Sequence, residues 1–399
     1  MLFNSADFLI FFPVVTLIYF IIPKRARYIW LLAASYYFYM SWNVKYVVLI
    51  LLSTAITWAG ALLLEKREQM KVRRLLLAGI LLGNLSILFF FKYFGFLWDN
   101  VGRALRLLHI QMAQNPFSFL LPVGISFYTF QTLGYVIDVY RGKVKAEKNP
   151  LRYALFVSFF PQLVAGPIER SERLLGQIRE MDRVTLWNYN NVVSGLTQML
   201  WGLFQKMVIA DRLSIFVDAV FRDLYMAGTV ETVLAAAAFS IQIYCDFAGY
   251  SCIAIGAARV MGVELMENFN APYFADSIAE FWRRWHISLS TWLKDYLYIP
   301  LGGNRCSRVK RYRNLMITFL VSGLWHGASW TFVIWGGLHG LYQLLGDLTR
   351  PVRQWIVEKC RVNTRAASYH LGQILLVFGL TAFAWIFFRA ESMRQAVQY

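Results

Sequence analysis

Long apolar runs separated by short basic loops are the feature that most restricts how this 399-residue chain can fold. The early runs cover residues 8–22, 30–42, 47–64, 75–98 and 117–136, and the later ones cover 192–210, 233–258, 314–345 and 369–388. A helix crosses a bilayer with about 20 apolar residues, and with fewer where flanking aromatic or basic side chains reach the interface. The runs therefore predict an all-α polytopic membrane protein.

The composition supports this class. Hydrophobic residues make up 58% of the chain and charged residues only 16%, whereas soluble domains carry about 25% charged residues. Aromatic residues, which collect at membrane interfaces, make up 17%. A disordered chain, a coiled coil and a disulfide-stapled secreted domain are excluded.

The net charge of +17 is concentrated in the loops between the runs. Under the positive-inside rule, the basic loops 23–27, 65–74 and 141–148 face the cytoplasm and the N-terminus lies outside. Anionic lipid is the expected counter-charge. Nucleic acid is not an expected partner, because no basic groove interleaved with aromatic residues accompanies the charge.

Two apolar stretches do not fit a simple crossing. Residues 153–168 contain Pro161, Gly166 and Pro167, which predicts a re-entrant pair of half-helices lining a cavity. Residues 314–345 are followed by another basic loop, so the run must enter and return, with a break near 323–327.

Residues 277–300 mix charged and aromatic side chains, and we expect one amphipathic helix there, at the inner face.

Histidines within these stretches are the first candidates for chemistry. His326 lies between Gly323 and Gly327 in an apolar run, where an imidazole can accept a proton near neutral pH or simply pack between helices. His286 follows Arg283 and Arg284, whose guanidinium groups could hold the phosphates of a carrier such as coenzyme A, or grip lipid headgroups. His339, on the same run as His326, could support it or merely pack.

Asp246 is a carboxylate within an apolar run and needs a partner there. A histidine or arginine lining a cavity would serve, and so would a structural ion pair closing the bundle. The four cysteines have no CxxC spacing and no histidine at metal-ligand spacing, so neither a metal site nor a disulfide is predicted.

Seven segments together resemble the membrane-bound O-acyltransferase family, of the bacterial alginate and polysaccharide O-acetyltransferase type. They are residues 121–128, 135–141, 160–167, 244–251, 266–269, 280–305 and 323–327. The resemblance implies one domain over residues 1–399, with about ten transmembrane or re-entrant helices around a tunnel. Because family members continue further, it also implies that C-terminal helices of a longer chain are missing.

The resemblance also assigns roles to residues. It implies that His326 is catalytic, as a general base, and that His286 is the second catalytic position. Asn304 and Arg305 join Arg283 and Arg284 as candidate contacts of the donor. Asp246, Tyr250 and Trp325 become candidate substrate or tunnel residues.

The function implied is transfer of an acetyl group from a cytoplasmic thioester, acetyl-CoA or another, for O-acetylation of an extracytoplasmic polysaccharide such as alginate. No bound cofactor is expected, and a periplasmic or membrane-anchored acetyltransferase is the expected partner at the bacterial inner membrane. D-alanyl or peptidoglycan acyl transfer on the same fold is an alternative. A proton-coupled transporter using Asp246 and His326 is another, disfavoured because no inverted repeat of broken helices is found.

Overall fold

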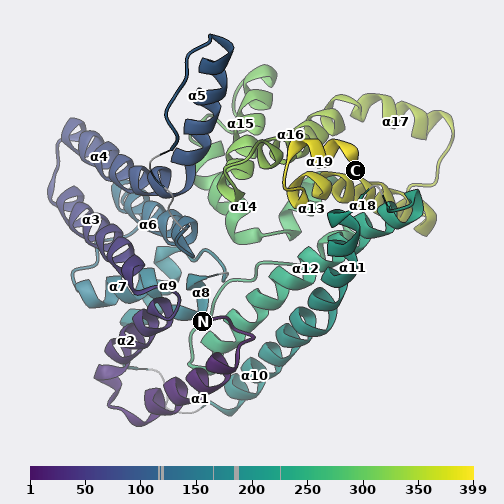
Figure 1. Cartoon of the computed structure of the whole chain (residues 1–399). Coiled ribbons are helices and arrows are strands. Elements are labelled where there is room, and N and C mark those ends of the chain that lie inside the picture. Colours follow the sequence, from purple (N-terminus) through teal and green to yellow (C-terminus); the bar gives the residue numbers. More distant parts are fainter. Residues whose placement is uncertain (116, 118–120, 165, 184–187, 225) are drawn as a thin grey trace. The chain divides into compact units, whose positions relative to one another are not determined.

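The computed structural model describes residues 1–399 except 116, 118–120, 165, 184–187 and 225. The described residues form helices and connecting turns, without a β-strand among them (Figure 1). Two compact units can be distinguished. The first comprises Met1–Leu203 with Tyr250–Met266, and the second comprises Phe204–Gly249 with Glu267–Tyr399.

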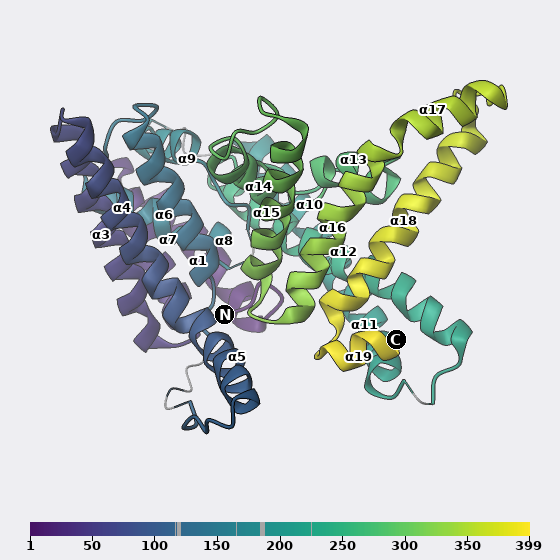
Figure 2. The same ribbon diagram turned by 90° about the horizontal axis from the view of Figure 1, so that it is seen from above.

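The first unit contains ten helices in the described part of the chain. They are α1 (Ala6–Ile21), α2 (Arg27–Met40), α3 (Val47–Lys66), α4 (Met70–Leu88), α5 (Phe94–Leu107), α6 (Ile125–Tyr140), α7 (Pro150–Ser158), α8 (Phe160–Leu163), α9 (Ser171–Arg179) and α10 (Tyr189–Leu203). A π-helical turn, Phe89–Tyr93, joins α4 to α5. Helices α3, α4 and α6 pack against one another (Figure 2).

The second unit contains the remaining helices. They are α11 (Asp211–Arg222), most of α12 (Thr229–Val260), α13 (Ile278–Arg284), α14 (Ile287–Leu293), α15 (Arg308–His326), α16 (Trp330–Leu348), α17 (Arg350–Lys359), α18 (Ala367–Arg389) and α19 (Met393–Gln398). Helices α15 and α16 form an antiparallel hairpin, and α18 packs on α16 (Figure 2).

The all-α membrane class predicted from the sequence is confirmed. In the part of the chain that the structure describes, four helical stretches are long and apolar enough to cross a bilayer: Val44–Lys66, Met70–Leu107, Thr229–Val260 and Ala367–Arg389. The broken character of residues 153–168 appears as α7 and α8, which meet at Phe159. The run 314–345 is divided where expected, since α15 ends at His326 and α16 begins at Trp330.

Two sequence expectations were wrong in detail. Residues 277–300 are not one helix, because α13 ends at Arg284 and α14 starts only after His286. The run predicted at 117–136 is helical from Ile125 onward, and its residues 118–120 lie outside the described residues. Left-handed Gly124 precedes that helix and sets its start.

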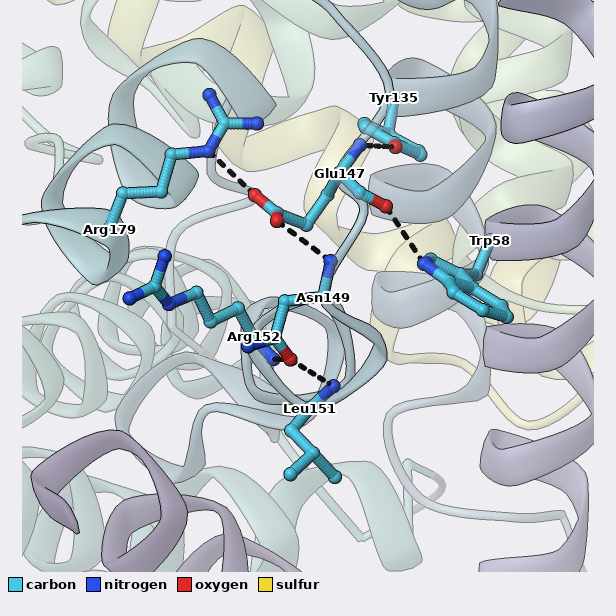
Figure 3. Close-up of polar contacts among 7 residues, drawn as sticks. All are labelled: Trp58, Tyr135, Glu147, Asn149, Leu151, Arg152 and Arg179. Atoms are coloured by element: carbon cyan, nitrogen blue, oxygen red, sulfur yellow. Dashed lines mark hydrogen bonds and ion pairs between the residues drawn. The ribbon is translucent and has the colours of Figure 1, made fainter. Parts of the chain in front are cut away.

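A buried carboxylate organises the loop between α6 and α7 in the first unit (Figure 3). Arg179 Nε on α9 donates to Glu147 Oε2 at 2.6 Å, and Trp58 Nε1 on α3 donates to the Glu147 carbonyl at 2.8 Å. The Glu147 backbone N–H donates to the Tyr135 hydroxyl at 2.8 Å. Because Glu147 is only 5% exposed, the Arg179 guanidinium offsets the cost of burying the Glu147 charge, while the other two bonds satisfy its backbone groups. Three helices, α3, α6 and α9, are tied to this loop.

Two glycines allow the closest backbone approach in the α15–α16 hairpin. A Cβ on Gly323 would lie 2.2 Å from the Phe332 carbonyl oxygen, and a Cβ on Gly336 would lie 2.3 Å from that of Phe319. Any larger side chain would force the helices apart. The hairpin geometry, and with it the position of His326 at the end of α15, depends on these glycines.

We predict that Gly336→Ala lowers the stability of the folded protein by about 1–3 kcal/mol, because its methyl group collides with rigid backbone. The neighbouring Gly337→Ala is the matched control, since its nearest contact would be Leu320 Cδ2 at an ordinary 3.7 Å. Thermal unfolding in detergent, followed by size-exclusion chromatography, measures both. Equal midpoints for the two variants would contradict the close-packed hairpin.

A second prediction concerns Glu169, which follows α8 and is 2% exposed. Burial raises the pKa of its carboxyl from 4.5 to about 7, although Met266 N–H donates to it. The folded state therefore holds this proton more tightly than the unfolded chain, and stability is lost as the pH rises through about 7. Glu169→Gln removes the titrating group. Its unfolding midpoint should fall less than that of the wild type between about pH 5 and about pH 8; parallel curves would contradict the prediction.

Candidate functional site

The turn between α13 and α14 holds His286 in a left-handed backbone conformation, with φ of 44°. This conformation is costly for a residue with a side chain and persists only where neighbours enforce it. Asn268 enforces it here. Its carbonyl accepts the Ile287 N–H at 2.9 Å, and its side-chain Oδ1 accepts the Ser288 N–H at 3.2 Å and the Ser288 hydroxyl at 2.8 Å.

The same contacts determine which ring nitrogen of His286 carries the proton. Because a backbone N–H donates to Asn268 Oδ1, that atom must be the amide oxygen, which can only accept. His286 Nδ1 lies 3.2 Å from it and must therefore donate. In the neutral ring, the acceptor nitrogen is then Nε2.

His286 is 1% exposed, on the amphipathic segment that lies outside the candidate spans. Burial lowers the pKa of His286 to about 3, because the charged imidazolium would lose its hydration. The titratable neighbour among its ring contacts is His326; the others are Phe247 and Trp325. His286 is therefore a neutral hydrogen-bonding group near neutral pH.

The structure brings the two predicted histidines together within the second unit. The ring centroids of His286 and His326 are 6.3 Å apart. The Trp325 ring lies 5.7 Å from His286 and 4.9 Å from His326 and contacts both edge-on. His326, at the end of α15, is half-buried and contacts the rings of Trp335 at 5.0 Å and Phe388 at 5.2 Å. This cluster of His286, His326, Trp325, Trp335 and Phe388 is called the histidine site below.

Two further side chains extend the histidine site, His339 on α16 and Trp282 on α13. His339 is fully buried, and its ring lies 5.1 Å from that of Trp335, one helical turn away. Trp282 Nε1 on α13 donates to His339 Nδ1 at 3.2 Å. This bond connects α13, which leads into the His286 turn, to the α15–α16 hairpin.

A cavity of about 300 Å³ lies between α13, α14 and α15. Trp282, Phe319 and Ser322 form part of its wall, and Arg283 and Lys294 supply positive charge. A second cavity of about 540 Å³ is lined by Asn304, Arg311, Arg350 and Arg353. Both cavities are bounded by Ala279, Tyr298, Leu315 and Gln343, so they are neighbours.

The four residues predicted to contact the acyl donor are distributed unevenly around these cavities. Arg283 lines the smaller one and Asn304 the larger one, where Asn304 Oδ1 accepts the Tyr298 hydroxyl at 2.6 Å. Arg284 instead pairs with Glu280 at 2.5 Å on its own helix. Arg305 is exposed and belongs to neither cavity lining.

Asp246 has a charged partner. Lys206 Nζ lies 2.5 Å from Asp246 Oδ1 and 2.9 Å from Asp211 Oδ1. Lys206 lies in the π-helical turn Phe204–Ala210, and its contact with Asp246 is the ion pair that the sequence left open beside a histidine or arginine partner. Tyr250 belongs to the first unit, where its ring lies 5.8 Å from that of Phe3.

Sequence reasoning did not identify Asn268 or Lys206. Asn268 lies in the segment 266–269 that carries part of the family resemblance, which was the available signal. Asn268 lies 18 residues before His286 in the sequence, and only the folded structure shows that the two side chains are in contact. For Lys206 the only signal was a cation within an apolar run.

Comparison of the sequence with known protein families agrees with this architecture. Residues 145–366 match the family model described as MBOAT, membrane-bound O-acyltransferase family. The chain belongs to the membrane-bound O-acyltransferase family. It is therefore an acyltransferase, and the matched region includes both histidines.

Three relatives illustrate the similarity. A probable alginate O-acetylase AlgI of Pseudomonas syringae pv. tomato is 41% identical over 404 residues, covering 99% of this chain and 74% of the relative. The protein of the same name in Pseudomonas aeruginosa is 39% identical, covering 99% and 73%. A peptidoglycan O-acetyltransferase of Helicobacter pylori is 37% identical, covering 100% and 79%.

The hydrogen bond between His286 Nδ1 and Asn268 Oδ1 gives a prediction about pH dependence. Asn268→Asp keeps the oxygen that accepts the Ser288 bonds, but its negative charge raises the pKa of His286 above the present value of about 3. His286 then becomes protonated as the pH falls, and acyl-transfer activity should decline at a higher pH than in the wild type. Asn270→Asp adds the same charge at an exposed position and is the control. Superimposable pH–rate profiles for wild type and Asn268→Asp would contradict the assigned contact.

Proposed function

We propose that this acyltransferase moves an acetyl group from a cytoplasmic acyl thioester, acetyl-CoA being the first candidate, for O-acetylation of an extracytoplasmic polysaccharide such as alginate. The observation that carries the proposal is the pairing of His286 and His326, at 6.3 Å, in one aromatic site. The high-coverage similarity to probable alginate O-acetylases supports the choice of acceptor.

The chemistry follows from the groups present. A thioester is already reactive, so transfer to a hydroxyl requires a base more than a protein nucleophile. His326 accepts the hydroxyl proton as the oxygen attacks the carbonyl carbon, and returns it to the departing thiolate. His286, with its proton on Nδ1, offers Nε2 as a hydrogen-bond acceptor and orients the attacking hydroxyl or His326 itself.

The cavity between α13, α14 and α15 is the candidate entrance for the donor. Its wall contains Trp282 and Phe319, both of which contact His339, so it adjoins the rings that extend the histidine site. Arg283 and Lys294 can attract a phosphate-bearing carrier. The larger neighbouring cavity, with Arg311, Arg350 and Arg353, offers further positive charge.

Sidedness and partner complete the proposal. The charge distribution supports basic loops in the cytoplasm and an N-terminus outside, and the proposed location is a bacterial inner membrane. The acetyl group then reaches the polysaccharide directly or through a periplasmic or membrane-anchored acetyltransferase.

Peptidoglycan is a second candidate acceptor, because the similarity to the peptidoglycan O-acetyltransferase extends over the whole chain. D-alanyl transfer on the same fold is a further alternative. For the transporter alternative, the carboxylate of Asp246 would have to leave Lys206, its partner at 2.5 Å, to relay a proton.

We predict that His326→Ala lowers turnover of labelled acetyl-CoA by about 10²–10⁴-fold in lipid-reconstituted protein, because the general base is lost. His370→Ala, at an exposed position of α18, is the control and should keep wild-type turnover. Wild-type activity in folded His326→Ala would contradict the assigned base. Polysaccharide and peptidoglycan fragments offered as acceptors distinguish the two candidate acceptors.

A further inference from the structure

Two hydrogen-bond donors on α16 are not used by the mechanism above. They are Trp335 Nε1 and His339 Nε2, on side chains that are both fully buried. Neither atom has a hydrogen-bond partner among the residues that the structure describes. A buried polar group without a partner costs about 1–3 kcal/mol, so such groups are rare and call for an explanation.

The state of His339 is fixed by its neighbour. Trp282 Nε1 can only donate, and it lies 3.2 Å from His339 Nδ1, so Nδ1 accepts and carries no proton. The ring proton is then on Nε2. Trp335 Nε1 is a donor in any state. The two unpartnered atoms are therefore both N–H groups, and each requires an acceptor.

Their placement relates them to the reacting groups. Positions 335 and 339 are four residues apart on α16, so the two side chains share one face of the helix. The ring centroids are 5.1 Å apart, and the Trp335 ring lies 5.0 Å from that of His326. The neighbouring rings of Trp282, Phe319, Trp385 and Phe388 offer no oxygen acceptor. The Tyr342 ring, which carries a hydroxyl, lies 5.8 Å from that of His339 but makes no hydrogen bond to Nε2.

We propose that the Trp335 indole N–H, supported by the His339 Nε2–H, binds the carbonyl oxygen of the acyl group and stabilises the oxyanion formed during transfer. This inference rests on the proposed thioester chemistry. In the addition step, the hydroxyl oxygen bonds to the carbonyl carbon, the C=O π electrons move to oxygen, and the proton goes to His326. In the second step, the carbonyl re-forms, the C–S bond breaks, and the thiolate takes the proton from His326.

A donor aimed at a developing oxyanion is worth more in a dry, aromatic environment than in water. The histidine site provides such an environment, since Trp335 and His339 have no solvent exposure. His286 cannot fill this role from Nδ1, because that proton is already engaged by Asn268. Trp335 and His339 therefore supply what the two catalytic histidines lack.

The first test is Trp335→Phe, which removes the N–H but keeps an aromatic ring. We expect kcat for the acetyl thioester to fall by about 10²–10³-fold with little change in KM, because the bond strengthens in the transition state. Trp385→Phe is the matched control. Its ring lies 5.6 Å from that of Trp335 and 5.0 Å from that of Trp285, whereas the Trp335 ring lies 5.0 Å from that of the proposed base, His326. Equal kcat values for the two variants would overturn the proposal.

The second test does not depend on turnover. A non-reactive ketone analogue of acetyl-CoA, with CH₂ inserted between sulfur and a ¹³C-labelled carbonyl, is bound to the reconstituted protein and its C=O stretch is measured by infrared difference spectroscopy. The proposal predicts a lower frequency in wild type than in Trp335→Phe, and an intermediate one in His339→Asn, which keeps an acceptor for Trp282. A bound analogue with the same frequency in all three overturns the proposal and assigns the two N–H groups to buried water. Failure of the wild type to bind the analogue counts against the acetyl-CoA donor itself and overturns the inference with it.

Discussion

The close approach of α15 and α16 at Gly323 and Gly336 is the constraint on which the histidine site depends. The backbones meet so closely that a Cβ at either position would lie within 2.3 Å of a carbonyl oxygen. This contact fixes His326 at the end of one helix against Trp335 on the next. His339, one turn further, then meets Trp282 and connects the hairpin to the turn that carries His286. Small residues at the contact between the two helices thus determine the positions of the polar side chains in the histidine site.

The polar groups of the site are few, and each has an assigned hydrogen-bonding direction. Asn268 Oδ1 accepts a hydrogen bond from Nδ1 of His286, and Trp282 Nε1 donates a hydrogen bond to Nδ1 of His339. The two imidazoles are therefore opposite tautomers, one presenting an acceptor at Nε2 and the other a donor. In a region built from aromatic rings, where unsatisfied polar atoms are costly, such fixed directions give acyl transfer both a place for a proton and a place for negative charge.

Much of this architecture could be predicted from the sequence. Apolar runs and basic loops indicated a helical membrane protein, and the basic loop after residue 345 required the return that occurs between His326 and Trp330. Glycines beside His326 and a basic, aromatic stretch around His286 marked both histidines. The pairing of the two could not be derived from local patterns, because it depends on helix packing over 40 residues of sequence. The left-handed turn at His286 was also missed, since no glycine or proline marks it and the enforcing residue, Asn268, lies 18 residues earlier. Lys206, which pairs with Asp246, lies in a π-helical turn that the apolar run 192–210 does not indicate.

The most direct test of the account is the protonation state of each buried imidazole. The chain contains five histidines, so ¹⁵N-histidine spectra of the reconstituted protein can be assigned by single substitutions. The account predicts that His286 at neutral pH is uncharged with its proton on Nδ1, and that His339 is uncharged with its proton on Nε2. A proton on Nε2 of His286, or a doubly protonated ring there, would contradict the arrangement of acceptor and donor on which the proposed acyl transfer rests.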